Sequence, residues 1–231
     1  MLCIGNLKIK EPRLYCIIGG WKMAEELWQE RSSEVAGKIL CPQETHVAWV
    51  FLLDTSSKMT GPSIKSLNKE LNDFIAQISS DEIASKTLDV AIIQFSDDYC
   101  LVQDFTPVSM MEPVELSAYG CCAMGGAINF AIDKVKGRVR LYNDMGTPYY
   151  QPFIFLITSG APTDDITAAA ERIKIEENKG EFGKLKFWAV GIPGADFEFL
   201  KTLSRRVIKL EDMFLGEIFK TDVRKKCLVI L

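Results

Sequence analysis

The stretch Val50-Phe51-Leu52-Leu53-Asp54-Thr55-Ser56-Ser57-Lys58-Met59 joins an apolar run to a polar loop. The apolar half predicts a buried strand. Residues two apart in an extended chain point the same way, so Asp54, Ser56 and Lys58 can converge on one volume. A carboxylate and a hydroxyl are oxygen ligands for a hard divalent cation, whereas a lysine ammonium competes with such a cation. The same residues also fit an ordinary solvated turn, so the choice between a cation site and a turn depends on the rest of the chain.

The composition is typical of a soluble globular protein. The chain has 231 residues, of which 48% are hydrophobic, and 27 basic against 31 acidic residues give a formal net charge of -4. This length allows one full hydrophobic core. No apolar run approaches the roughly 20 residues that cross a bilayer, and the charge balance indicates no basic surface for nucleic acid. We expect no membrane partner and no nucleic-acid partner.

The cysteines indicate a reducing compartment rather than a disulfide scaffold. Seven are scattered without a C-x-x-C pair, at Cys3, Cys16, Cys41, Cys100, Cys121, Cys122 and Cys227. This pattern gives poor support for zinc, and the lack of an export signal favours the cytoplasm. The adjacent Cys121 and Cys122 raise the possibility of a redox sensor. Adjacent disulfides are strained, so we favour packed, small apolar positions for both thiols.

Strand and helix patterns alternate from His46 onward. Buried strands are predicted at 47–53, 88–95, 153–158 and 185–191, and amphipathic helices at 63–78, 124–135 and 166–175. The run 99–103 follows the second strand too closely for a crossover, so it predicts an antiparallel edge strand. The fold class is therefore α/β, a three-layer α/β/α Rossmann-like sandwich with a mainly parallel sheet.

The regular pattern also sets the expected domain boundaries. Residues 46–222 form one domain, preceded by an N-terminal extension at 1–45 and followed by a C-terminal tail at 223–231. A second hypothesis places the native start at Met23, because the codons of Gly19-Gly20-Trp21-Lys22 can spell a purine-rich ribosome-binding site. The tail combines charge with an apolar, β-prone end, which fits an added strand, packing on the sheet or a contact with another chain.

Three loops are expected to meet at one edge of this sheet. Ligand crevices in such folds lie beyond the carboxyl ends of the strands, where the strand order reverses. Asp54 stands at one strand end, the loop 158–165 follows another strand, and the loop 117–126 precedes a helix. These loops are where we expect the function of the protein to lie.

Residues 47–221 resemble the von Willebrand factor A domain, and more closely its compact bacterial cytosolic branch found near tellurium-resistance and stress genes. Gly61-Pro62, the loop 160–165 and Ala189-Val190-Gly191 carry the closer resemblance. The resemblance implies a metal-ion-dependent adhesion site with an Asp-x-Ser-x-Ser strand end, a threonine in a Gly-Gly-Thr loop and an aspartate in a Thr-Asp-Gly loop. It also implies a partner protein that places an acidic residue on the bound ion.

When the ligand positions of the family are compared with this sequence one residue at a time, the predicted site is degenerate. Asp54 and Ser56 match the first two ligands, but Lys58 replaces the second serine, Cys122 the threonine and Ser159 the aspartate. The two carboxylate charges of the family pattern become one negative and one positive charge, and a thiol is a poor ligand for a hard cation. We predict no cofactor and no tightly bound Mg2+ or Mn2+. If Mg2+ binds weakly, Asp54 and Ser56 are the expected ligands.

The ammonium of Lys58 has three interpretations. It neutralises Asp54 as an internal cation, it offers a salt bridge to an acidic residue of a partner, or it simply pairs with Asp54 or turns into solvent. The partner-binding residues predicted from the resemblance are Asp54, Ser56, Lys58, Cys122, Ser159 and Asp164.

The predicted function is a non-enzymatic interaction module in a bacterial cytoplasm, implied by the resemblance to act in a tellurite or stress-response system. One alternative is a metal-dependent adhesion module with weak Mg2+ binding. Another is a vestigial phosphatase of the haloacid-dehalogenase type with Asp54 as nucleophile, although Ser56 occupies the position of its general acid. The only histidine, His46, precedes the first strand, so no catalytic residue is predicted.

Overall fold

The computed structural model describes residues 39–160, 162–179 and 184–210. Most of the predicted N-terminal extension, the start at Met23 and the C-terminal tail lie outside these residues. Within them, no helix combines the length and the apolar character that crossing a bilayer requires.

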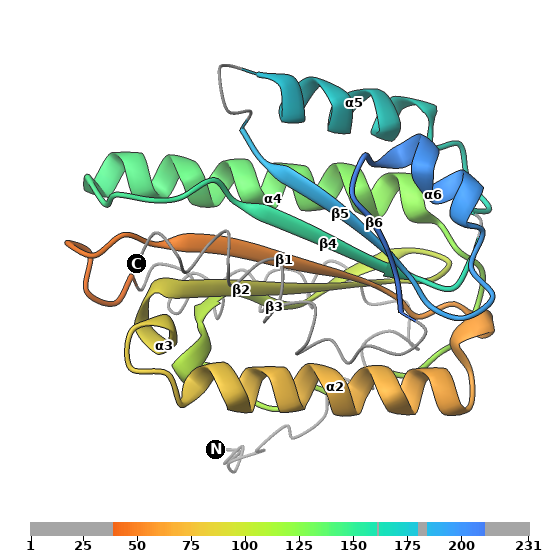
Figure 1. The fold of residues 1–231 in the computed structure, drawn as a ribbon, viewed down its shortest axis with the longest axis horizontal. Coiled ribbons are helices and arrows are strands. Elements are labelled where there is room, and N and C mark those ends of the chain that lie inside the picture. Colours follow the sequence, from red (N-terminus) through yellow and green to blue (C-terminus); the bar gives the residue numbers. More distant parts are fainter. Residues whose placement is uncertain (1–38, 161, 180–183, 211–231) are drawn as a thin grey trace, which may run out of the picture. The chain divides into compact units, whose positions relative to one another are not determined.

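A six-stranded sheet forms the centre of the fold, in the order β3-β2-β1-β4-β5-β6 (Figure 1). Neighbouring strands are parallel except for β2 and β3, which pair antiparallel as predicted from their short connection. The strands span Val47–Asp54, Leu88–Phe95, Tyr99–Pro107, Phe153–Thr158, Lys186–Gly191 and Val207–Lys209, numbered β1 to β6. The strand order reverses between β1 and β4, so the carboxyl ends of these two strands mark the edge where ligands bind in such folds.

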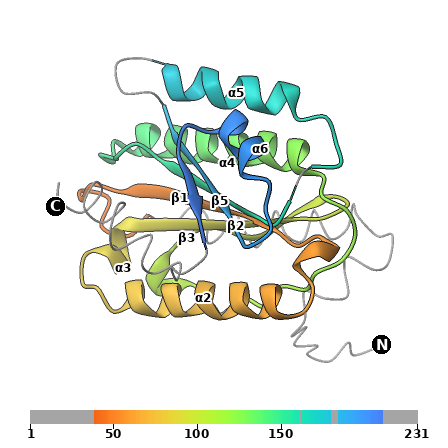
Figure 2. The same cartoon turned by 45° about the vertical axis from the view of Figure 1, so that its right-hand side comes forward.

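Helices cover both faces of the sheet (Figures 1 and 2). One face carries α2 (Pro62–Ser79) and α3 (Ala84–Thr87), and the other carries α4 (Met124–Met145), α5 (Thr167–Asn178) and α6 (Phe197–Leu203). Short 3-10 helices lie at η2 (Ser57–Met59) and η3 (Val108–Met110). The three-layer prediction is confirmed.

The boundaries of several elements differ from the predicted ones. Helix α4 continues well past residue 135 and ends where Gly146 adopts a left-handed conformation with φ of 67°. The sequence pattern did not predict α3, α6 or β6, because elements this short hold too few residues to show a period.

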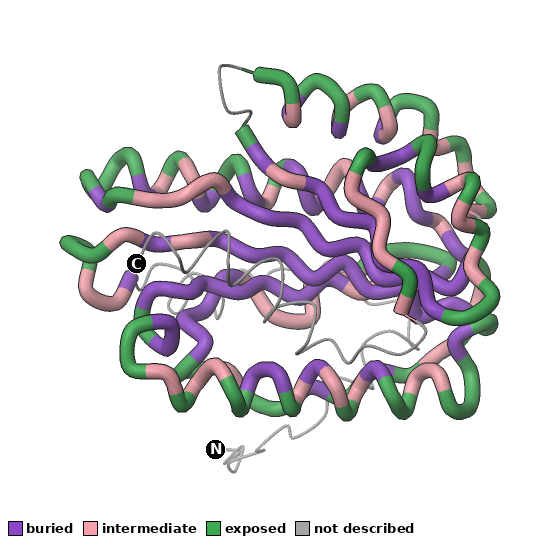
Figure 3. The backbone as a smooth tube through the Cα atoms, viewed as in Figure 1, coloured by how far each residue is buried: buried purple, intermediate pink, exposed green. Residues whose placement is uncertain are grey.

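Alternate residues of β1 face two separate cores, and the strand itself is buried (Figure 3). Val50 and Leu52 pack with α4, whereas Phe51 and Leu53 pack with α2. A central parallel strand covered on both faces accounts for the unbroken apolar run. Asp54 continues the alternation of Leu52, so its side chain turns toward the α4 side.

A buried polar cluster closes the opposite, amino end of the sheet. Asp89 Oδ2 accepts from His46 Nδ1 at 3.0 Å and from the hydroxyl of Tyr142, and it lies 2.9 Å from Arg138 Nη2. His46 Nε2 contacts the carbonyl oxygen of Leu40 at 2.8 Å, and the ring has no exposed surface. The only histidine of the chain is thus a structural residue, remote from Asp54 along β1.

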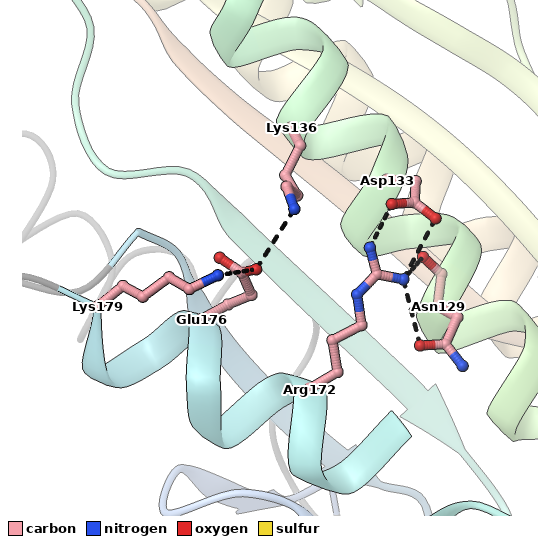
Figure 4. Close-up of polar contacts among 6 residues, drawn as sticks. All are labelled: Asn129, Asp133, Lys136, Arg172, Glu176 and Lys179. Atoms are coloured by element: carbon pink, nitrogen blue, oxygen red, sulfur yellow. Dashed lines mark hydrogen bonds and ion pairs between the residues drawn. The ribbon is translucent and has the colours of Figure 1, made fainter. Parts of the chain in front are cut away.

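Ion pairs hold α5 against α4 (Figure 4). Arg172 reaches the carboxylate of Asp133 and the side chain of Asn129. Glu176, which is 2% exposed, accepts from Lys179 at 2.7 Å and from Lys136 at 3.5 Å. Burial by itself would raise the pKa of Glu176, but the hydrogen bond from Lys179 and the charge of Lys136 outweigh burial and lower it.

We predict that Glu176→Gln lowers the free energy of unfolding by about 1–2 kcal/mol at pH 7. A carboxyl group with a lowered folded pKa stabilises the protein above its unfolded pKa, and this contribution is lost as the pH falls through the folded pKa. The difference from the wild type therefore shrinks as the pH falls below about 4.5. Urea unfolding as a function of pH measures it. The exposed Glu171→Gln on the same helix is the control, and an equal loss in both variants would contradict the prediction.

Candidate functional site

The carboxylate of Asp54 lies at the carboxyl end of β1 with no exposed surface. Its Oδ1 accepts from the backbone N–H of Ser56 at 2.8 Å. Its Oδ2 accepts from Thr158 Oγ1 at 2.7 Å, and from the backbone N–H and the Oγ of Ser159 at 3.0 and 3.1 Å. The thiol of Cys122 is a weaker donor at 4.0 Å. We call Asp54, Ser56, Cys122, Thr158 and Ser159 the Asp54 cluster.

The first two loops are joined by main-chain hydrogen bonds. The backbone N–H of Tyr119 donates to the carbonyl of Thr55 at 2.8 Å, and the N–H of Ser57 donates to the carbonyl of Gly120 at 3.0 Å. Ser56 between them is 2% exposed, and no other described residue hydrogen-bonds its Oγ. This part of the edge therefore retains one unused hydroxyl beside Asp54.

The second and third loops are also joined. Cys122 donates its backbone N–H to Thr163 Oγ1 at 3.1 Å and accepts from the N–H of Thr163 at 2.8 Å. Asp164 Oδ2 accepts from the N–H groups of Gly125 and Gly126, at 2.8 and 3.3 Å, in the first turn of α4. A carboxylate is favourable there because the N–H groups of the first turn have no partner within the helix.

Lys58 is exposed and lies across the third loop. A Cβ at position 160 would stand only 2.8 Å from Lys58 Nζ and 3.1 Å from its Cδ, so the side chain passes over Gly160. Among the described residues, no ion pair joins Lys58 to Asp54, whose oxygens accept from the neutral donors given above. The ammonium therefore stands near the Asp54 cluster at the surface, without direct pairing to its carboxylate.

The two adjacent thiols have different surroundings. Burial, followed by the charges of Asp54 and Asp164, raises the pKa of Cys122 to about 12, although the charge of Lys58 opposes this rise. The exposed Cys121 has its pKa raised by a hydrogen bond to Asp97 and by the charge of that carboxylate. Neither environment resembles the electropositive setting that activates a cysteine.

The structure brings together most of the residues predicted for the site. Asp54, Cys122 and Ser159 are in contact, Ser56 binds through its backbone, and Lys58 lies nearby over Gly160. Asp164 is directed to the start of α4 instead. In the part of the chain that is described, no three His, Cys, Asp or Glu side chains gather as a metal site.

Two participants were not predicted from the sequence. Thr158 makes the shortest contact to Asp54, and Gly160 provides the space for Lys58. The available signal for Thr158 was its place at the end of the strand beside β1. No local pattern indicates Gly160, because its role depends on a side chain from another loop.

The family model of the von Willebrand factor type A domain matches residues 50–220. The chain belongs to this family. The match contains the strand end at Asp54 and both of the other loops of the site, and domains of this family are generally protein-interaction modules.

Solved structures share the fold at low sequence identity. The von Willebrand factor domain of the type V pilus tip protein Mfa5 from Porphyromonas gingivalis has a TM-score of 0.59 at 11% identity, over 81% of this chain and 97% of that one. The pilus adhesin SpaC from Lactobacillus rhamnosus GG has a TM-score of 0.59 at 12% identity, over 79% and 30%. Proximal thread matrix protein 1 from the mussel byssus, with a zinc-occupied metal-ion-dependent adhesion site, has a TM-score of 0.53 at 15% identity, over 74% and 42%.

Such identities establish the fold alone. This chain spans 42% of the length of the mussel protein and 30% of the length of SpaC. No curated protein sequence matches the chain.

We predict that Cys122 resists alkylation by iodoacetamide at pH 8. A pKa of about 12 leaves on the order of one thiol in ten thousand ionised, and the side chain is 3% exposed. Its labelling rate should fall roughly a thousandfold below that of the urea-unfolded chain. Fragment-ion mass spectrometry locates the modified residue. Equal labelling rates of Cys122 in the folded and unfolded chains would contradict the prediction that this thiol is buried and has a raised pKa.

Proposed function

We propose that this domain binds a partner protein through the loops around the Asp54 cluster, with the ammonium of Lys58 as the charged contact and without a divalent ion. The observation that carries the proposal is the separation of the two charges. Asp54 is buried among protein donors, while Lys58 lies exposed over Gly160. An acidic side chain is the partner group that fits an exposed ammonium.

The residues of the Asp54 cluster do not fit a hard divalent cation. The hydroxyls of Thr158 and Ser159 donate their protons to Asp54, a thiol occupies position 122, and an ammonium stands close enough to affect that thiol. Mg2+ requires near-octahedral oxygen ligands at short distances, and a nearby positive charge repels it. These features support a site that does without the ion.

The cellular setting follows from the resemblance. We place the protein in a bacterial cytoplasm, in a tellurite or stress-response system, because Gly61-Pro62 and the loop 160–165 resemble the bacterial cytosolic branch of the family. The scattered cysteines of the sequence, which include no C-x-x-C pair, support a reducing compartment.

No observation favours the phosphatase alternative. A carboxylate nucleophile needs access to its substrate, whereas Asp54 has no exposed surface and both of its oxygens accept hydrogen bonds from the protein. The structure therefore offers no support for a reaction at this residue.

We predict that isothermal titration detects no Mg2+ binding to the wild type at millimolar concentrations. The triple variant Lys58→Ser, Cys122→Thr, Ser159→Asp should bind Mg2+, because it removes the ammonium and the thiol and adds a carboxylate. Circular dichroism of both proteins controls for folding. Micromolar Mg2+ affinity in the wild type that disappears in Asp54→Ala would overturn the metal-free site.

We predict that Lys58→Met and Gly160→Ala both weaken partner capture from a lysate of the native host. The first removes the ammonium, and the second displaces it, since the added Cβ would meet Lys58 Nζ at 2.8 Å. Quantitative mass spectrometry should show roughly a fivefold loss of the same proteins in both variants, equivalent to about 1 kcal/mol. Salt should weaken the capture and a chelator should not.

The matched control is Gly137→Ala in α4, where an added Cβ would meet nothing within 4 Å. This variant should capture the same proteins as the wild type. Proteins retained by both Lys58→Met and Gly160→Ala, or lost on chelation, would contradict the proposed binding mode.

A further inference from the structure

Two asparagines of α2 bind the main chain of a distant segment. Asn68 Nδ2 donates to the carbonyl of Leu116 at 2.9 Å, and Asn68 Oδ1 accepts from the N–H of the same residue at 2.8 Å. Asn72 repeats the arrangement with Val114, at 2.8 and 2.9 Å. Each side-chain amide therefore pairs both main-chain groups of one residue, as a neighbouring strand would do.

The spacing of the two pairs explains why a helix can take the place of a strand. Four residues of helix rise by about 6 Å, and two residues of an extended chain rise by about 6.8 Å. Asn68 and Asn72 lie one turn apart on the same face, and their partners lie two residues apart. Asn72, the later of the two asparagines, pairs with Val114, the earlier of the two partners. The segment therefore runs antiparallel to α2, toward the N-terminus of the helix, which follows the loop of Lys58.

This pairing lies within a longer series of contacts. At the far end of α2, Ser79 Oγ donates to the carbonyl of Val108 at 3.0 Å. Val114 and Leu116 are 8% and 4% exposed and pack in the same core as Leu71. Beyond them the chain reaches the loop 117–123, which bonds to the first loop and carries Cys122 into the Asp54 cluster. The segment 108–123 is thus fixed along its length, and the asparagines hold its middle.

We infer that Asn68 and Asn72 are positioning residues of the proposed binding site. They hold residues 112–118 extended so that the loop 117–123 reaches Asp54 and the loop 158–165. Because α2 also begins directly after the loop of Lys58, one helix sets the positions of two of the three loops. The inference takes these loops as the binding site, as proposed above. Its test requires no partner, so its failure and the failure of the proposed function are distinguishable.

The test is the alkylation rate of Cys122 in the double variant Asn68→Ala, Asn72→Ala. The substitution removes both amide pairs and places strong helix formers in α2, so the helix itself is retained. Opening of the loop 117–123 should raise the labelling of Cys122 by iodoacetamide about tenfold over the wild type. Hydrogen exchange of residues 112–123 should accelerate in parallel, while exchange in β1 and β4 stays unchanged.

The controls separate a local effect from general destabilisation. Cys100 on β3 is the internal reference, and Asn143→Ala on an exposed position of α4 is the matched substitution. Asn68→Asp, which keeps the shape of the side chain but loses the donor to Leu116, should give the same selective change. An unchanged rate at Cys122 would overturn the inference. An equal rise at Cys122 and Cys100 would also overturn it, because the amides would then support the whole fold rather than this loop.

Discussion

Burial of a carboxyl group is costly unless hydrogen-bond donors replace water, and Asp54 is a carboxyl group without exposed surface. Its donors come from its own loop, from the end of β4 and from the loop before α4. The arrangement of all three loops is therefore tied to the hydrogen bonds that they donate to one buried carboxyl group. Parallel pairing makes this possible, because it places the carboxyl ends of β1 and β4 side by side.

The same constraint leaves the charge of Lys58 at the surface. Because N–H and O–H donors already stabilise Asp54, its carboxylate needs no direct ion pair, and the lysine side chain extends over Gly160 instead. In the proposed binding mode, the exposed ammonium of Lys58 beside the buried carboxyl group of Asp54 is the charged contact for a partner protein.

The long strands and helices could be predicted from the sequence because steric constraints and burial impose a regular spacing on their apolar residues. The strands at β1, β2 and β4 and the helix α2 lie within one residue of their predicted limits, and Asp54, Cys122 and Ser159 meet as expected. The contributions of Thr158, Gly160 and the two asparagines were not predicted. Asn68 lies 48 residues from its partner Leu116, and an isolated asparagine in a helix carries no sign of what it binds.

The sequence by itself determined the layered α/β fold, the mainly parallel sheet with one antiparallel edge strand and the chemical groups present in the three loops. Those properties follow from local periodicity and from the rule that parallel strands end at a common edge. Only the tertiary structure decided which groups face one another, because hydrogen-bond partners here are separated by many residues in the chain. It placed Thr158 and Ser159 on Asp54, Lys58 over Gly160 and the amides of α2 on the segment that leads to Cys122.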